Sequence, residues 1–134
     1  MMKIISLLIL LSLSSLAFAD DAAIERYINA KQIVLEAQIN QLFDAIFVLG
    51  NEDLSQEAAF DKIGQPSFKA VDNALKNSGY SHSQFYQFAG KHKDDITEWL
   101  GRHAATANDL NTLEAQRDQL MQDYDQLIKR LAAQ

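Results

Sequence analysis

The stretch Leu110–Leu131, LNTLEAQRDQLMQDYDQLIKRL, carries the strongest folding signal in this chain of 134 residues. Seven of its positions recur at alternating spacings of three and four without a slip, namely Leu110, Leu113, Arg117, Leu120, Tyr124, Leu127 and Leu131. Such a period of about 3.5 residues is typical of a coiled-coil seam, where one face of a helix packs against a partner helix. We therefore expect a helix over about 95–132 whose C-terminal part needs a second helix beside it.

A second apolar pattern, over residues 22–49, supplies the partner. Its apolar residues mostly repeat at helical spacings, namely Ile24, Ile28, Leu35, Ile39, Leu42, Ile46 and Leu49. Gly50 follows, where a helix C-terminus favours a residue that tolerates positive φ. The part from Leu42 to Leu49 is apolar nearly all round, which predicts a position at the centre of the core.

We expect the two long helices, 22–49 and 95–132, to pair in antiparallel, because the chain between them can reverse its direction. With Ile24 opposite Leu131, Lys31 falls near the acidic Asp123 and Asp125. This register gives the lysine a partner that self-pairing of the seam would not provide. The expected assembly is a monomer, or a weak homodimer formed through the overhanging end of the longer helix.

Three short helices are expected between the long ones, over about 56–63, from Pro66 to Gly79 and from 81 to 90. Ser81 with Gln84 three residues later is a capping box, and Tyr80 with Phe85 fits the hydrophobic staple around it. Asp95 with Glu98 repeats the capping pattern at the start of the last helix, in which Gly101 marks a place for a bend. No alternating strand pattern occurs, so the predicted fold class is all-α.

The N-terminus has the features of a secretory signal peptide. Lys3 precedes an apolar run over residues 4–16, and the small-x-small triplet Ala17-Phe18-Ala19 precedes Asp20. The run is shorter than the roughly 20 residues that a bilayer span needs. We expect cleavage of residues 1–19 and a single soluble helical domain over 20–134, without membrane insertion, in a Gram-negative periplasm in preference to a Gram-positive wall.

Charge and cysteine content narrow the classes of partner. Removal of Lys3 with the signal leaves 11 basic against 18 acidic side chains, a balance of −7. Nucleic acids and anionic membrane surfaces require clustered Lys and Arg, so neither is an expected partner. The chain has no cysteine, which excludes disulfides and a lipid anchor on a cysteine after the signal.

Three residues are candidates for binding a small anionic or apolar ligand. Lys31 and Arg117 are basic residues on the apolar lines of the two long helices, and His103 shares a face with Trp99. A small-acid enzyme or carrier would use such groups, whereas a structural interpretation pairs the two cations with acidic residues at the rim and makes His103 a core histidine. The acidic partners considered are Glu36, Glu114, Asp123 and Asp125.

No cofactor, metal or catalytic residue is predicted. His92 and His103 would lie roughly 16 Å apart on one helix, too far for a common metal ion, and no pair of His residues has ligand spacing. Secreted helical chorismate mutases are similar to this chain in size and expected fold. However, the Arg and Lys residues do not follow that family's motif, so an enzyme remains the alternative hypothesis.

Aromatic residues suggest a second kind of site. Phe47, Tyr86 and Trp99 are candidates for an exposed patch that binds another envelope protein, and the structural alternative is a compact aromatic core. Small helical periplasmic chaperones of the Spy and CpxP kind are similar in export signal, size and helical content. Their Leu-Thr-x-x-Gln signature is absent, since the segment 113–116 reads LEAQ, and no residue role is carried over. The leading hypothesis is a non-catalytic accessory, chaperone-like or inhibitor protein that acts through protein contacts.

Overall fold

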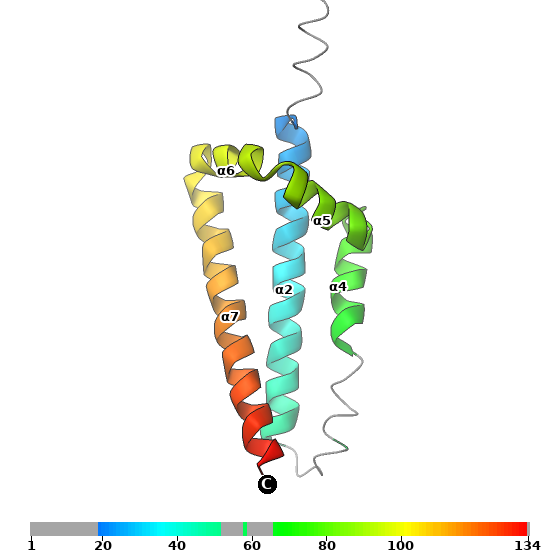
Figure 1. Ribbon diagram of the computed structural model, residues 1–134, viewed down its shortest axis with the longest axis vertical. Coiled ribbons are helices and arrows are strands. Elements are labelled where there is room, and N and C mark those ends of the chain that lie inside the picture. Colours follow the sequence, from blue (N-terminus) through cyan, green and yellow to red (C-terminus); the bar gives the residue numbers. More distant parts are fainter. Residues whose placement is uncertain (1–18, 52–57, 59–65, 134) are drawn as a thin grey trace, which may run out of the picture.

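A computed structural model describes residues 19–51, 58 and 66–133, and these residues contain helices and no strand (Figure 1). The helices are α2 (Asp21–Asn51), α4 (Pro66–Asn77), α5 (His82–Lys91), α6 (Lys93–Arg102) and α7 (Ala104–Ala132). The predicted all-α class, with long helices at both ends and short helices between them, is confirmed. The predicted signal segment up to residue 18 and the short helix at 56–63, apart from Ala58, lie outside the described residues.

The two long helices run in the same direction, so the antiparallel prediction is wrong (Figure 1). Lys31 on α2 contacts Glu114 on α7, and further along both helices Gln38 contacts Arg117. Residue numbers therefore increase together along the pair. The physical reason lies in the short helices: α4 returns alongside α2, and α5 and α6 then cross the end at which α2 begins, so α7 starts beside the start of α2 (Figure 1).

The predicted register is wrong for the same reason. Ile24 and Leu131 lie at opposite ends of the bundle, and Lys31 does not reach Asp123 or Asp125. The expected overhang is absent as well, because α2 has 31 residues and α7 has 29, and both end at the same end of the molecule (Figure 1).

The predicted C-terminal helix is divided at His103, close to the bend expected at Gly101. In a continuous helix the His103 N–H would donate to the Trp99 carbonyl; here it donates to the Leu100 carbonyl at 3.1 Å. The imidazole of His103 supplies the missing hydrogen bond to the Trp99 carbonyl. Its Nδ1 lies 2.7 Å from the Trp99 oxygen and must be the donor, because a carbonyl oxygen only accepts. The side chain thus satisfies the end of α6 while the backbone turns into α7.

The predicted seam of α7 is confirmed as the face that packs on α2. Leu110 is buried and the six other seam positions are half-buried, from Leu113 to Leu131. The exposed Met121 lies off the seam. The choice of α2 as the partner was therefore correct, although its direction was not.

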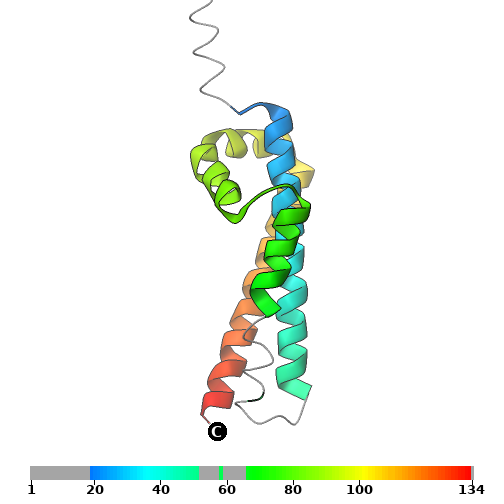
Figure 2. The ribbon, with the colours of Figure 1, turned by 90° about the vertical axis from the view of Figure 1, so that its right-hand side faces the viewer.

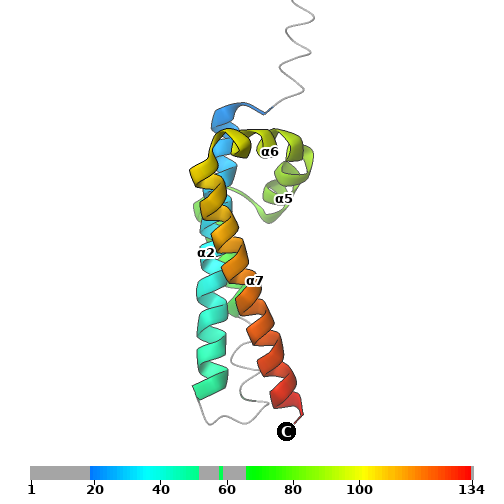
Figure 3. The ribbon, with the colours of Figure 1, turned by 90° about the vertical axis from the view of Figure 1, so that its left-hand side faces the viewer.

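The core surrounds the first half of α2 and includes residues from each of the other four helices. Its large buried members are Ile24, Tyr27, Ile28, Val34, Leu35, Leu75, Phe85, Trp99 and Leu110. Figures 2 and 3 show α5 and α6 projecting to one side of the α2–α7 pair. The predicted core centre at 42–49 is wrong, since only Leu49 is buried there and Phe43 is exposed, because α4 stops short of that end of α2 (Figure 1).

The connection between α4 and α5 follows the prediction. Gly79 ends α4 with φ of +79°, a left-handed conformation that favours glycine. Ser81 Oγ accepts the Gln84 N–H at 3.1 Å and Gln84 Oε1 accepts the Ser81 N–H at 3.0 Å, which confirms the capping box. The Tyr80 and Phe85 rings meet edge to face at 6.0 Å, as the staple requires. At α6, by contrast, the expected cap Asp95 is the third helical residue.

Candidate functional site

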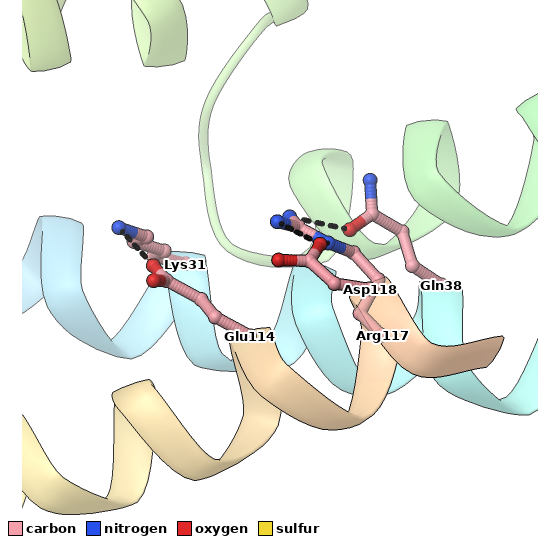
Figure 4. A network of polar contacts seen from close by, with 5 residues as sticks. All are labelled: Lys31, Gln38, Glu114, Arg117 and Asp118. Atoms are coloured by element: carbon pink, nitrogen blue, oxygen red, sulfur yellow. Dashed lines mark hydrogen bonds and ion pairs between the residues drawn. The ribbon is translucent and has the colours of Figure 1, made fainter. Parts of the chain in front are cut away.

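Two of the predicted ligand-binding residues, Lys31 and Arg117, lie in one polar network between α2 and α7 (Figure 4). Lys31 Nζ is 2.8 Å from Glu114 Oε1. Arg117 Nε and Nη2 donate to Asp118 Oδ1 at 3.1 and 3.0 Å, and Arg117 Nη1 donates to Gln38 Oε1 at 3.5 Å. The five side chains point to the same side of the helix pair (Figure 4).

Both cations of this network already have carboxylate partners. The side chains of Lys31 and Glu114 are 31% and 35% exposed, so solvent screens their attraction and each such pair contributes about 1 kcal/mol or less. An anionic ligand would have to displace Glu114 or Asp118 to reach the positive charges. Pairing of Lys31 with Glu114 was one of the predicted structural outcomes and is confirmed, whereas pairing with Asp123 or Asp125 is wrong.

The third predicted ligand-binding residue, His103, lies apart from this network. It stands at the junction of α6 and α7, where its ring stacks on Trp99 with centroids 3.7 Å apart and an interplanar angle of 12°. The residue as a whole is exposed, so the prediction of a core histidine is wrong. Its roles are to satisfy the Trp99 carbonyl and to cover one face of the indole.

The three predicted partner-binding aromatics do not form one surface. Trp99 is only 5% exposed and belongs to the core, which removes it from any docking patch. Tyr86 is exposed on α5 and stacks on His82 at 5.1 Å. Phe47 is exposed near the C-terminal end of α2, far from α5 (Figure 1). The structure therefore separates two exposed aromatics and buries the third.

Tyr27 is the aromatic residue that the sequence reasoning missed. It is buried against Phe85 and Phe88, with ring centroids 5.0 and 5.2 Å away, and so joins α2 to α5. Burial raises the pKa of the Tyr27 phenol, and the Glu114 carboxylate raises it further. Its position three residues after Ile24 fits the helical spacing of the core face and was the signal that could have identified it.

The outer face of α2 carries more apolar surface than the described packing covers. Ile33 and Phe43 are 44% and 58% exposed, and residues ten apart differ by only about 80° around a helix. In the described part of the chain, α2 is long and apolar enough to cross a membrane by length and composition. Of the residues in its apolar 18-residue stretch, 22% are buried in the protein. We call this surface, defined by Ile33 and Phe43, the outer face of α2.

A hollow of about 320 Å³ lies between α2 and the end of α4. Arg26 borders it, donating from Nη2 to the Gly79 carbonyl at 3.2 Å and lying 4.9 Å from the centre of the Tyr80 ring. Ile33 lines the same hollow, which therefore continues the outer face of α2. Within residues 19–51, 58 and 66–133, no three His, Asp or Glu side chains come together as a metal site.

Comparison with known proteins identifies no relative of this chain. The chain matches no family model, and no curated protein or solved structure is significantly similar to it.

Proposed function

We propose that this chain is an exported, non-catalytic helical protein of the Gram-negative periplasm, cut after Ala19, which acts by docking the outer face of α2 onto another envelope protein. The observation that supports it is the exposure of two large apolar side chains, Ile33 and Phe43, on the side of α2 that does not form the core. Removal of apolar surface from water contributes about 25 cal/mol per Å² before the entropic cost of association is subtracted, and contiguous exposed apolar patches are typical of interaction sites.

The remainder of the molecule suits such a role. The side-chain balance of −7 after signal removal favours solubility, and the core around the first part of α2 provides a folded support for the exposed part. An accessory, chaperone-like or inhibitor protein needs a soluble folded core and an exposed binding surface, and no catalytic residues. The alternative of a small-anion site at Lys31 and Arg117 is weaker, because each cation already contacts a carboxylate.

Photo-crosslinking in the periplasm tests the proposal. A photoreactive phenylalanine analogue placed at position 43 should yield an adduct with one envelope protein, identified by mass spectrometry. The same analogue at Asp109, an exposed residue of α7, is the matched control and should yield no adduct. Adducts with lipid alone at position 43, or equal adducts at both positions, would refute protein docking through this face.

Loss of the apolar side chain should have the complementary effect. Phe43→Ser should abolish capture of the crosslinked partner while leaving the helical circular dichroism unchanged, because the side chain is exposed. Asp44→Ser changes the adjacent exposed residue and should retain capture.

A further inference from the structure

Residues 19–21, at the start of α2, contact α6, which crosses the end of the bundle at which α2 begins (Figure 1). The Ala19 N–H donates to Asp95 Oδ2 at 3.2 Å, and Arg102 Nη2 donates to Asp21 Oδ1 at 3.3 Å. Asp95 and Arg102 are seven residues apart, which is about two turns and places them on the same face of α6. One face of α6 thus presents an anion and a cation to residues 19–21.

The Asp95 carboxylate is shielded from water and depends on protein donors. Its side chain is 17% exposed, and besides the Ala19 N–H its Oδ2 has a contact with His92 Nδ1 at 3.4 Å. Its position in the first turn of α6 lets the helix dipole stabilise the negative charge. Loss of the 3.2 Å donor would leave a shielded carboxylate with the longer contact from His92, which is unfavourable unless another donor replaces it.

Removal of the signal changes the donor at this place. Cleavage after Ala19 takes its N–H away and creates an amino group on Asp20, one residue further on, where adjacent Cα atoms are about 3.8 Å apart. An ammonium group offers three donors and a positive charge, so it adds direct attraction between opposite charges to the hydrogen bond that an uncharged amide makes with the carboxylate.

We propose that Asp95 is the binding site for the α-ammonium group of processed Asp20, so that removal of the signal replaces a hydrogen bond from an uncharged amide by an ion pair between the new N-terminus and α6. This inference rests on the cleavage proposed above. It gives the processed chain a contact that the precursor lacks, at the point where the first helix enters the core.

The charged groups around the new terminus come from both helices. On the α2 side these are the carboxylates of Asp20 and Asp21, the latter already in contact with Arg102. On the α6 side they are Asp95 and Arg102, Glu98 at helical spacing between them, and His92 immediately before the helix. Replacing Asp95 alone therefore separates its contribution from that of the terminal residue's own carboxylate.

The test uses processed protein recovered from the periplasm, with its N-terminus determined by mass spectrometry. The rate at which acetic anhydride modifies the α-amino group is measured against pH in folded and in urea-unfolded protein. We expect the amine to titrate about one pH unit higher in the folded protein, because a carboxylate within reach favours the ammonium form. Asp95→Asn should remove the difference. Asp94→Asn, which deletes an exposed carboxylate one position earlier, should retain it.

The outcomes distinguish this inference from the processing on which it rests. A terminus at Asp20 whose amine titrates alike in folded and unfolded protein would overturn the ammonium site alone. A terminus elsewhere would overturn the proposed cleavage and the site with it. Loss of the difference in Asp94→Asn would also overturn the site, because the cause would then be the general field of the first turn. If Asp95→Asn does not fold, the comparison of folded and unfolded wild-type protein with Asp94→Asn still decides.

Discussion

Lys31 and Glu114 form an ion pair at 2.8 Å between α2 and α7, and this contact identifies the two long helices as a parallel pair. In an antiparallel pair Lys31 would instead lie beside the last turns of α7, where Asp123 and Asp125 are located. The pair is partly exposed to solvent, so it contributes little to stability. It nevertheless shows which turns of the two helices lie side by side.

A double-mutant cycle tests this pairing. Lys31→Met and Glu114→Gln should each lower the free energy of unfolding, and their coupling should be about 0.2 to 1 kcal/mol, because the pair is partly exposed. Urea unfolding of the two single variants and the double variant gives the value. The control is the cycle of Lys31→Met with Asp123→Asn, which should show no coupling. Coupling to Asp123 in place of Glu114 would mean that the helices are antiparallel.

Burial along the seam of α7 predicts a gradient of stability. Leu110→Ala should destabilise the fold by about 2 to 5 kcal/mol, since Leu110 is buried among five helices. Leu120→Ala should cost only about 1 to 2 kcal/mol, because the side chain is half-buried. The exposed Asp109 serves as control, and Asp109→Ala should change little. Equal effects at Leu110 and Leu120 in urea unfolding would contradict the described packing.

The stack of His103 on Trp99 predicts that the imidazole shields one face of the only tryptophan of the chain from solvent. Removal of the ring exposes that face, so His103→Gln should move the fluorescence emission maximum to longer wavelength and increase quenching by acrylamide. His92→Gln changes a histidine whose ring contacts Phe88, and should leave both quantities unchanged. Unchanged emission and quenching in His103→Gln would contradict the stack.

The raised pKa of Tyr27 predicts that the fold loses stability at alkaline pH. Burial, and then Glu114, raises its pKa in the folded chain above the ordinary 10.0, so above pH 10 the folded state binds more protons than the unfolded state. The resulting stabilisation is fully present below pH 10 and is lost as pH rises through the folded pKa. Urea midpoints measured from pH 9 upward should fall less steeply in Tyr27→Phe. Tyr86→Phe, at an exposed ring, should follow the wild type, and a parallel decline in Tyr27→Phe would contradict the assignment.

The proposed signal cleavage predicts the N-terminus, and therefore the mass, of the exported protein. Protein recovered from the envelope should begin at Asp20, because Ala17 and Ala19 provide the small side chains that the cleavage site needs. Ala19→Leu should accumulate as an uncut precursor, while Ala22→Leu, beyond the site, should be processed normally. Wild-type protein that retains Met1 in the envelope would refute the export proposal.

Local patterns in the sequence determined most of the helices and several of their ends. The capping box at Ser81 and the glycine at Gly79 act through hydrogen bonds and φ preferences within a few residues, so they are readable without any tertiary context. The 3.5-residue period of α7 likewise identified its buried face and its need for a partner helix. These are properties of one helix or turn at a time, and the all-α class follows from them.

Direction, register and the separation of candidate sites were decided by tertiary structure alone. Apolar periodicity is the same whichever way a helix runs, so nothing in the seam distinguishes a parallel from an antiparallel partner. At the break at His103 the imidazole satisfies the Trp99 carbonyl, and the crossing of α6 before this break brings α7 beside the start of α2. That crossing buries Trp99 and places Asp95 against Ala19, whereas Phe43 is exposed because α4 does not extend to its end of α2. Contacts between residues far apart in sequence arise only when the whole chain has folded.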